Sequence, residues 1–135
     1  MRASSSNQHP VEYFDVYGRG SNAVKIHPQA SLVKFVVVAE CDNLAECDVQ
    51  TQTLDCIRQV DDILKQTGCE AWSTTSVQIY LKDIERDYAG MNSVYDAWVQ
   101  AKCRGQPPVR ACVEAKLYTK EALVEFVVEA VALDG

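Results

Sequence analysis

Few side chains in this sequence have the types and spacing that catalysis or metal binding requires. The six cysteines stand at positions 41, 47, 56, 69, 103 and 112, and no two of them form a Cys-x-x-Cys pair. The histidines are His9 and His27, so no ligand set has zinc-binding spacing, and no metal or other cofactor is expected. No secretory signal precedes the cysteines. Reduced thiols are therefore expected, in the cytoplasm or in an organelle.

Arg110 and Cys112 stand two residues apart in a stretch whose side chains alternate in character. Apolar residues occupy every second position from Val109 to Leu117, which predicts a strand with Arg110, Cys112 and Glu114 on one side. A guanidinium group can bind a carboxylate through two parallel hydrogen bonds. Anion binding is therefore the chemistry that this face could perform.

The length and charge of the chain limit its class. Its 135 residues suffice for one domain, expected over residues 11–135 after a polar, serine-rich extension over residues 1–10. The net charge is −6, from 13 Lys and Arg against 19 Asp and Glu, which argues against a nucleic-acid partner. No apolar run approaches the roughly 20 residues that span a bilayer, so no membrane segment is expected.

The periodicity of the sequence changes several times after Pro10 and predicts two helices interleaved with six strands. The order β-β-β-α-β-α-β-β predicts an α+β fold, in which both helices cover one face of a mixed sheet. The predicted elements are strands near Glu12–Tyr17, Ala23–Ile26 and Leu32–Glu40, a helix between Asp48 and Gly68, a strand over Ser73–Lys82, a helix containing Met91–Val99, and strands over Val109–Leu117 and Leu123–Ala132.

No predicted helix packs on the other face of this sheet. Alternation places Val36, Val38, Leu123, Val127 and Val131 on it, so the face is partly apolar. An exposed apolar sheet face is a site of self-association. A homo-oligomer is therefore expected.

Several segments form recognisable motifs. Tyr80–Asp83 followed by Asp87–Tyr95 resembles a strand, Lys-Asp, and then Phe-Ala-x-x-Asn-x-x-Tyr. Pro108–Ala115 resembles Pro-x-Arg-Ser-x-Val-x-Val, Val128–Ala132 resembles Glu-Ala-Ile-Ala, and Ser21–Val24 resembles Ser-Gln-Ala-Val. Together, and in this order, they resemble the Rid (YjgF-type) family over most of the chain.

The resemblance implies a chorismate-mutase-like fold with six strands and two helices. It also implies a homotrimer, in which three sheets form a central barrel with the helices outside. Three clefts between neighbouring subunits would then bind small carboxylates and imines. Characterised members of this family hydrolyse reactive enamines and 2-imino acids to 2-keto acids and ammonia.

Two residues match positions that line the cleft in this family. Arg110 stands where an arginine clamps the substrate carboxylate and orients the imine carbon; the alternative is a salt bridge between subunits. Cys112 stands where a residue shapes the pocket; the alternative is a buried thiol. Imine hydrolysis needs only water and proton transfer, so Cys112 need not be a nucleophile.

Three other cleft positions depart from the family pattern. Val127 stands where deaminases of the family carry a glutamate that positions water. Gly20 replaces a pocket tyrosine, and Val38 replaces a serine or threonine. Glu125 shares the predicted face of Val127, but same-face neighbours on a strand are about 6.5–7 Å apart, so Glu125 is a poor substitute.

Three further residues have open roles. Asn92 matches the helix motif and either pins a loop at a subunit interface or faces solvent. Tyr95 lies on the apolar stripe of the same helix, where core packing is expected. Arg19 either faces the cleft, where a second arginine would favour a more anionic ligand, or is a surface residue of a turn.

Two hypotheses for function remain. The first is hydrolysis of a 2-imino or enamine acid, and the second is a non-catalytic trimer that binds a small carboxylate and acts through a partner. Arg110 supports both, whereas Val127 favours the second. Ribonuclease activity, which has been attached to relatives, is not expected, because the chain is acidic and neither His9 nor His27 lies in a catalytic context.

Overall fold

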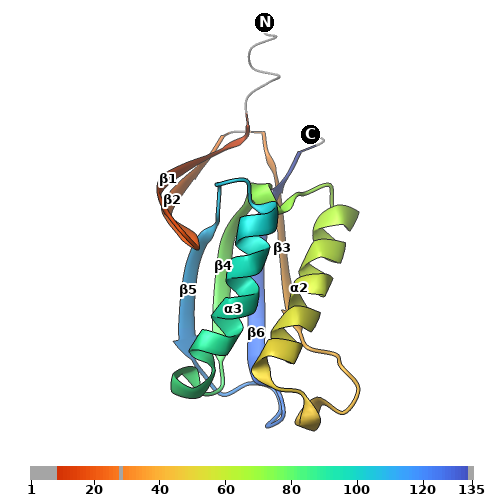
Figure 1. The fold of residues 1–135 in the computed structure, drawn as a ribbon. Helices are drawn as coiled ribbons and strands as arrows, with labels where there is room; N and C mark the ends of the chain where they lie inside the picture. The colour runs from red at the N-terminus through yellow and green to blue at the C-terminus, as the bar shows by residue number, and fades with distance from the viewer. Residues whose placement is uncertain (1–8, 28, 134–135) are drawn as a thin grey trace, which may run out of the picture.

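The computed structural model describes residues 9–27 and 29–133 and contains the predicted order of helices and strands (Figure 1). Of the predicted N-terminal extension, residues 1–8 lie outside the described residues, and the ring of His9 packs 4.8 Å from that of Trp72. The elements are β1 (Val11–Tyr17), β2 (Gly20–Ile26), β3 (Ser31–Val38), η1 (Leu44–Glu46), α2 (Val49–Gln66), η2 (Ala71–Ser73), β4 (Thr74–Leu81), α3 (Ile84–Lys102), β5 (Val109–Glu114) and β6 (Val124–Ala132).

The strands form one mixed sheet in the order β1-β2-β5-β4-β6-β3. β4 pairs in parallel with β5 and antiparallel with β6, and β3 completes that side antiparallel to β6. The β1–β2 hairpin joins the sheet through one parallel pair, Ser21 with Val109. The hairpin therefore diverges from β5 at the end of the sheet where β5 begins (Figure 1).

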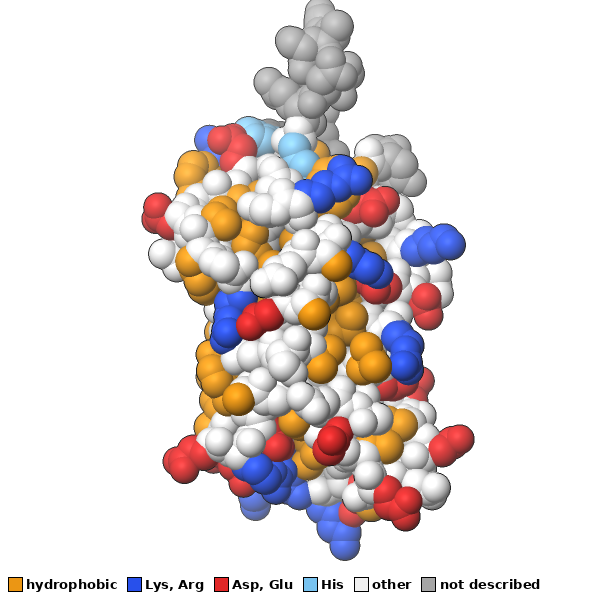
Figure 2. Space-filling model, viewed as in Figure 1, with side chains coloured by type: hydrophobic (Ala, Val, Ile, Leu, Met, Phe, Trp, Pro, Cys, Tyr) orange, Lys and Arg blue, Asp and Glu red, His pale blue; other side chains and the backbone are white. Residues whose placement is uncertain are grey.

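Both helices lie on one face of this sheet, as predicted (Figure 1). Each helix starts at an aspartate that caps it: Asp48 accepts a hydrogen bond from the Thr51 amide at 2.8 Å, and Asp83 accepts one from the Arg86 amide at 3.0 Å. Charged groups of both signs are scattered over this helical side of the molecule (Figure 2). None of the helices in the described ranges has the length and apolar character needed to cross a membrane.

The core lies between the helices and the face of the sheet that they cover. The rings of Tyr95 on α3 and Phe126 on β6 stack there with 6.3 Å between their centroids, and both are almost fully buried. The buried apolar residues of α2 face this layer, which explains how a helix with a polar outer side is held in place. Other core residues include Cys56, Val60, Ile79, Leu81, Met91, Val124 and Val128.

The opposite face of the sheet is uncovered in the single chain, as predicted. Leu32 is 70% exposed and Val36 is 55% exposed, both on β3, and Val113 on β5 is 44% exposed. Two expected members of this face differ: Val131 is fully buried, and Leu123 packs against the core. Leu123 precedes the first residue of β6, so the alternation of the strand does not apply to it.

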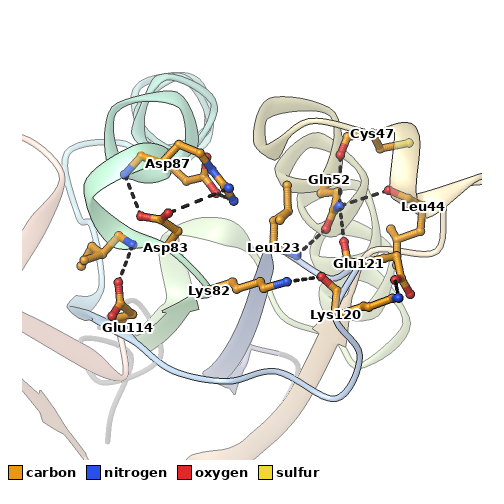
Figure 3. A network of polar contacts seen from close by, with 12 residues as sticks. Leu44, Cys47, Gln52, Lys82, Asp83, Asp87, Glu114, Lys120, Glu121 and Leu123 are labelled. Atoms are coloured by element: carbon orange, nitrogen blue, oxygen red, sulfur yellow. Dashed lines mark hydrogen bonds and ion pairs between the residues drawn. The ribbon is translucent and has the colours of Figure 1, made fainter.

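The buried side chain of Gln52 forms hydrogen bonds with two loops, one before α2 and one before β6 (Figure 3). The Gln52 side chain on α2 is 0% exposed. Its amide nitrogen donates to the carbonyls of Cys47 at 3.2 Å and Glu121 at 3.0 Å, and its oxygen accepts from the Leu123 amide at 2.9 Å. The segments before α2 and before β6 are therefore joined through one side chain.

Candidate functional site

Arg110 is the second residue of β5, and its side chain lies against α3. The register pairs Arg110 with the core residue Val77, so the side chain points toward the helical layer. Its Nη1 donates a hydrogen bond of 2.7 Å to Oδ1 of Asn92, and the guanidinium carbon lies 4.8 Å from the ring centroid of Tyr95. Arg110 is thus fixed by an amide and an aromatic ring.

The charge of Arg110 is not balanced by a carboxylate within residues 9–27 and 29–133. None of the ion pairs among the residues that the structure describes includes Arg110. Its hydrogen-bond partners are the neutral Asn92 amide and the Tyr88 hydroxyl, the latter at 3.4 Å. Two of five N–H donors are engaged, so the remaining donors are available to an anion.

Asn92 and Tyr95 have clear roles in this arrangement. Asn92 is 5% exposed and holds Arg110 of its own chain, so it does not face solvent. Tyr95 is fully buried, which confirms the predicted core packing. Burial raises the pKa of the Tyr95 hydroxyl above its ordinary value, and the charge of Arg110 opposes this. The Tyr95 hydroxyl has no hydrogen-bond partner among the described residues.

Cys112 lies two residues beyond Arg110 on the same side of β5, as alternation predicts. The thiol is half-buried, and desolvation raises its pKa above the ordinary value, while the charge of Arg110 acts in the opposite direction. A thiol with a raised pKa is a weak nucleophile at neutral pH. The position and the raised pKa of Cys112 do not favour a nucleophilic role.

Tyr88 and Arg19 complete the cluster around Arg110. The sequence pointed to Arg19 as a candidate but did not identify Tyr88. The Tyr88 hydroxyl accepts a 3.3 Å hydrogen bond from Nη1 of Arg19 as well as the bond from Arg110. Arg19 also forms an ion pair of 2.8 Å with Asp96. The two arginines thus meet at Tyr88.

The helix supplies the spacing of this cluster. Tyr88, Asn92 and Asp96 follow one another at intervals of four residues along α3, so they share one side of the helix. That side faces the point where the β1–β2 hairpin diverges from β5. The four-residue spacing was visible in the sequence, but nothing in the sequence indicated which strand it faces.

Gly20 leaves space that another side chain fills. A Cβ atom built on Gly20 would lie 2.6 Å from the Tyr17 hydroxyl and 3.3 Å from the Pro108 carbonyl. The glycine therefore allows the Tyr17 ring to close over the start of β5. Any larger residue would displace that ring.

The single chain does not bring Val38 and Val127 to Arg110. Val127 pairs with Gln78 and Val36, and Val38 pairs with Glu125, so these valines lie on the uncovered face of the sheet. Arg110 points to the helical face. Only a neighbouring subunit could complete a cleft that contains both sets of positions.

A surface hollow of about 830 Å³ lies elsewhere, between the C-terminal turns of α2 and α3. Asp61, Lys102 and Arg104 are among its lining residues, and Arg110 is not. Asp61 is bound there by Lys102 at 2.6 Å and by the Trp98 ring nitrogen at 2.9 Å. Asp61 and Lys102 already bind each other there, so we place the candidate site at Arg110.

Comparisons with known sequences cover most of the chain. The family described as Endoribonuclease L-PSP matches residues 21–133. The RutC family protein YoaB from Escherichia coli is 36% identical over 81 residues, which are 60% of this chain and 68% of YoaB. A RutC family protein from Pyrococcus abyssi is 31% identical over 117 residues, covering 79% of this chain and 87% of its own.

Solved structures of related proteins have the same fold. A YjgF family member from Neisseria meningitidis is 35% identical and aligns with a TM-score of 0.67 over 93% of this chain and 98% of its own. A YjgF/YER057c/UK114 family member from Mycobacterium tuberculosis is 28% identical, with a TM-score of 0.61 over 83% of this chain and 86% of its own. The two helices and the six-stranded sheet are therefore those of this group of proteins.

Proposed function

This chain belongs to the family described as Endoribonuclease L-PSP, the family of the YjgF and RutC proteins, and on that premise we propose that it hydrolyses reactive 2-imino and enamine acids. The products are a 2-keto acid and ammonia. The net charge of −6 makes RNA a poor substrate for the same surface. Water is the only co-reactant, so the reaction needs no cofactor.

The observation that carries this proposal is the unbalanced charge of Arg110. A half-buried guanidinium with no ion-pair partner in the described chain is suited to an anionic ligand. Its planar fork would hold the carboxylate of a 2-imino acid and so fix the neighbouring imine carbon. Asn92 and Tyr95 keep the fork in position before the ligand arrives.

The reaction itself requires little of the protein. Water adds to the carbon of the C=N bond and gives a carbinolamine. The C–N bond then breaks, the carbinolamine hydroxyl loses its proton, the amine gains one, and ammonia leaves. A carboxylate next to the carbon is present throughout, so Arg110 orients the substrate in every step.

We also propose that the active form is a homotrimer in the cytoplasm. The uncovered sheet face, with its exposed Leu32 and Val36, supports assembly through that face. A neighbouring subunit would bring its own Val38 and Val127 toward a cleft that contains Arg110. The site would then be shared between two chains.

A second function is favoured by Val127. Valine cannot position water, and general acid–base groups typically contribute about 10²–10⁴-fold to a rate. A trimer that binds a carboxylate without turning it over would use Arg110 in the same way. Activity and binding therefore need to be measured separately.

The test is ammonia release from 2-iminobutyrate, generated in situ by an amino-acid oxidase. We expect the wild type to accelerate the release, and Arg110→Ala to lower kcat/KM by roughly 100-fold or more, because charge-assisted hydrogen bonds to the carboxylate are lost. Arg58→Ala is the matched control, since Arg58 is an exposed arginine on α2. The contrary outcome is folded wild type that does not accelerate the release but shows a thermal shift with 2-ketobutyrate that depends on Arg110. That result would overturn the enzyme hypothesis and support the carboxylate-binding function.

A further inference from the structure

The Tyr88 hydroxyl lies at the centre of the cluster around Arg110 and has no role in the reaction as described so far. We infer that Tyr88 is the proton donor of this site, a polar group in a cleft where Val127 can neither position water nor transfer a proton. This inference rests on the proposed imine hydrolysis. In this inference, the proton that the departing amine requires comes from Oη of Tyr88.

The hydrogen bonds around this oxygen determine where its proton points. Oη accepts from Nη1 of Arg19 at 3.3 Å and from Nη2 of Arg110 at 3.4 Å. Guanidinium groups only donate hydrogen bonds, so neither can take the phenol proton. In the described part of the chain no acceptor for that proton is present among the hydrogen bonds of Tyr88. The proton is therefore directed away from both arginines and is available to a ligand.

The position of Tyr88 places that ligand within reach. Tyr88 and Asn92 are one helical turn apart on α3, and both contact the guanidinium of Arg110. A carboxylate bound by the remaining donors of Arg110 would therefore lie beside the phenol. Tyr88 is 40% exposed, so a ligand can approach it from the surface of the chain.

The hydroxyl is a feature of this chain. The motif Phe-Ala-x-x-Asn-x-x-Tyr has a phenylalanine at the position of Tyr88, so the ring matches the motif and the oxygen is added. The same chain lacks the polar groups expected at Val127 and Gly20. Relative to the family pattern, this chain thus gains the Tyr88 hydroxyl and lacks the polar side chains at Val127 and Gly20.

The proton transfer balances without another reagent. As the C–N bond of the carbinolamine breaks, Tyr88 gives its proton to the amine nitrogen, and ammonia leaves with the electron pair of that bond. The carbinolamine hydroxyl becomes the carbonyl and returns its proton to the phenolate. Negative charge on Oη during this exchange is met by hydrogen bonds from Arg19 and Arg110, which are already in place.

The test is Tyr88→Phe, which removes one oxygen and keeps the ring. We expect kcat for 2-iminobutyrate to fall by about 100-fold or more while KM changes little, because the carboxylate is still held by Arg110. Tyr118→Phe is the matched control, since Tyr118 is 65% exposed in the loop between β5 and β6. Thermal unfolding of both variants checks that the fold is kept.

The possible outcomes separate this inference from the proposed function. An unchanged kcat for Tyr88→Phe would overturn the inference and leave imine hydrolysis in place. A raised KM with unchanged kcat would make Tyr88 a support for Arg110, which also overturns the inference. Wild type that releases no ammonia would overturn the proposed function, and the inference with it.

Discussion

Arg110 is bound by a neutral partner, and this choice of partner matters for function. An arginine paired with a carboxylate has already satisfied its charge, whereas one paired with an amide has not. The Asn92 oxygen lies 2.7 Å from Nη1 of Arg110 and fixes the guanidinium without neutralising it. Asn92 is itself almost fully buried, so this contact is shielded from water.

Replacing Asn92 with aspartate tests this argument. The side chains have the same shape, but Asn92→Asp places a negative charge on the atom that already contacts Arg110. We expect KM for 2-iminobutyrate to rise by roughly tenfold or more, equivalent to about 1.4 kcal/mol of lost binding, because the new carboxylate competes with that of the ligand. Steady-state kinetics of ammonia release measure the change.

The control places the same charge nearby on α3. Ser93 is exposed and its hydroxyl bonds to Gln50 on α2, so Ser93→Asp adds a charge that does not contact Arg110. Equal values of KM for Asn92→Asp and Ser93→Asp would show that the neutral partner is unimportant.

Only part of this cluster could be predicted from the sequence. Alternation along β5 was enough to place Arg110 and Cys112 on one side, because a strand has a fixed period of two. The contact of Arg19 with Tyr88 joins residues 69 positions apart, and no local pattern encodes it. The structure places Val38 and Val127 on the sheet face opposite Arg110, and the family motifs alone did not indicate this separation.

The elements themselves were more predictable, and their ends less so. The change to helical periodicity between Asp48 and Gly68 predicted α2 within a few residues. The strand predicted over Val109–Leu117 instead ends at Glu114. Its partner β4 ends at Leu81, whose carbonyl accepts a last bond from Ala115 at 2.9 Å, so no strand remains for the following residues to pair with.

Gln52 gives a prediction about how these elements are held together. Gln52→Leu introduces an apolar side chain of similar size and leaves the Cys47 and Glu121 carbonyls and the Leu123 amide without this partner. Each buried, unsatisfied polar group costs about 1–3 kcal/mol, and these three are partly buried, so we expect the free energy of unfolding to fall by roughly 3 kcal/mol. Urea denaturation measures this loss.

Gln50→Leu is the comparison on the same helix. Gln50 is exposed, and substitutions at such positions usually change stability by less than about 0.5 kcal/mol. Similar losses in both variants would show that the bonds of Gln52 do not stabilise the fold beyond ordinary helix packing.

At the scale of the whole molecule, the two faces of the sheet differ. One face is covered by α2 and α3 and holds the core, while the other exposes Leu32, Val36 and Val113. An apolar sheet face is unfavourable in water, and its burial against copies of itself removes that cost. Since Val127 and Arg110 point to opposite faces, assembly is also the step that would join the two halves of a cleft.

A lysine on the edge strand β3 of the uncovered face tests this assembly. Val36 is 55% exposed in the single chain, and Val36→Lys would place a charge in each copy of an interface that excludes water. We expect light scattering to give three chains for the wild type and one for Val36→Lys, with unchanged circular dichroism. Ammonia release should fall as well, because the cleft is shared.

Leu54→Lys provides the matched control for this experiment. Leu54 is 44% exposed on α2, on the helical side of the molecule, so the same kind of charge is introduced away from the sheet. We expect it to remain a trimer with wild-type activity. A Val36→Lys protein that stays trimeric, or a wild type that is monomeric at working concentration, would show that the uncovered face is not where the chains meet. The site at Arg110 would then have to function within one chain, without Val38 and Val127.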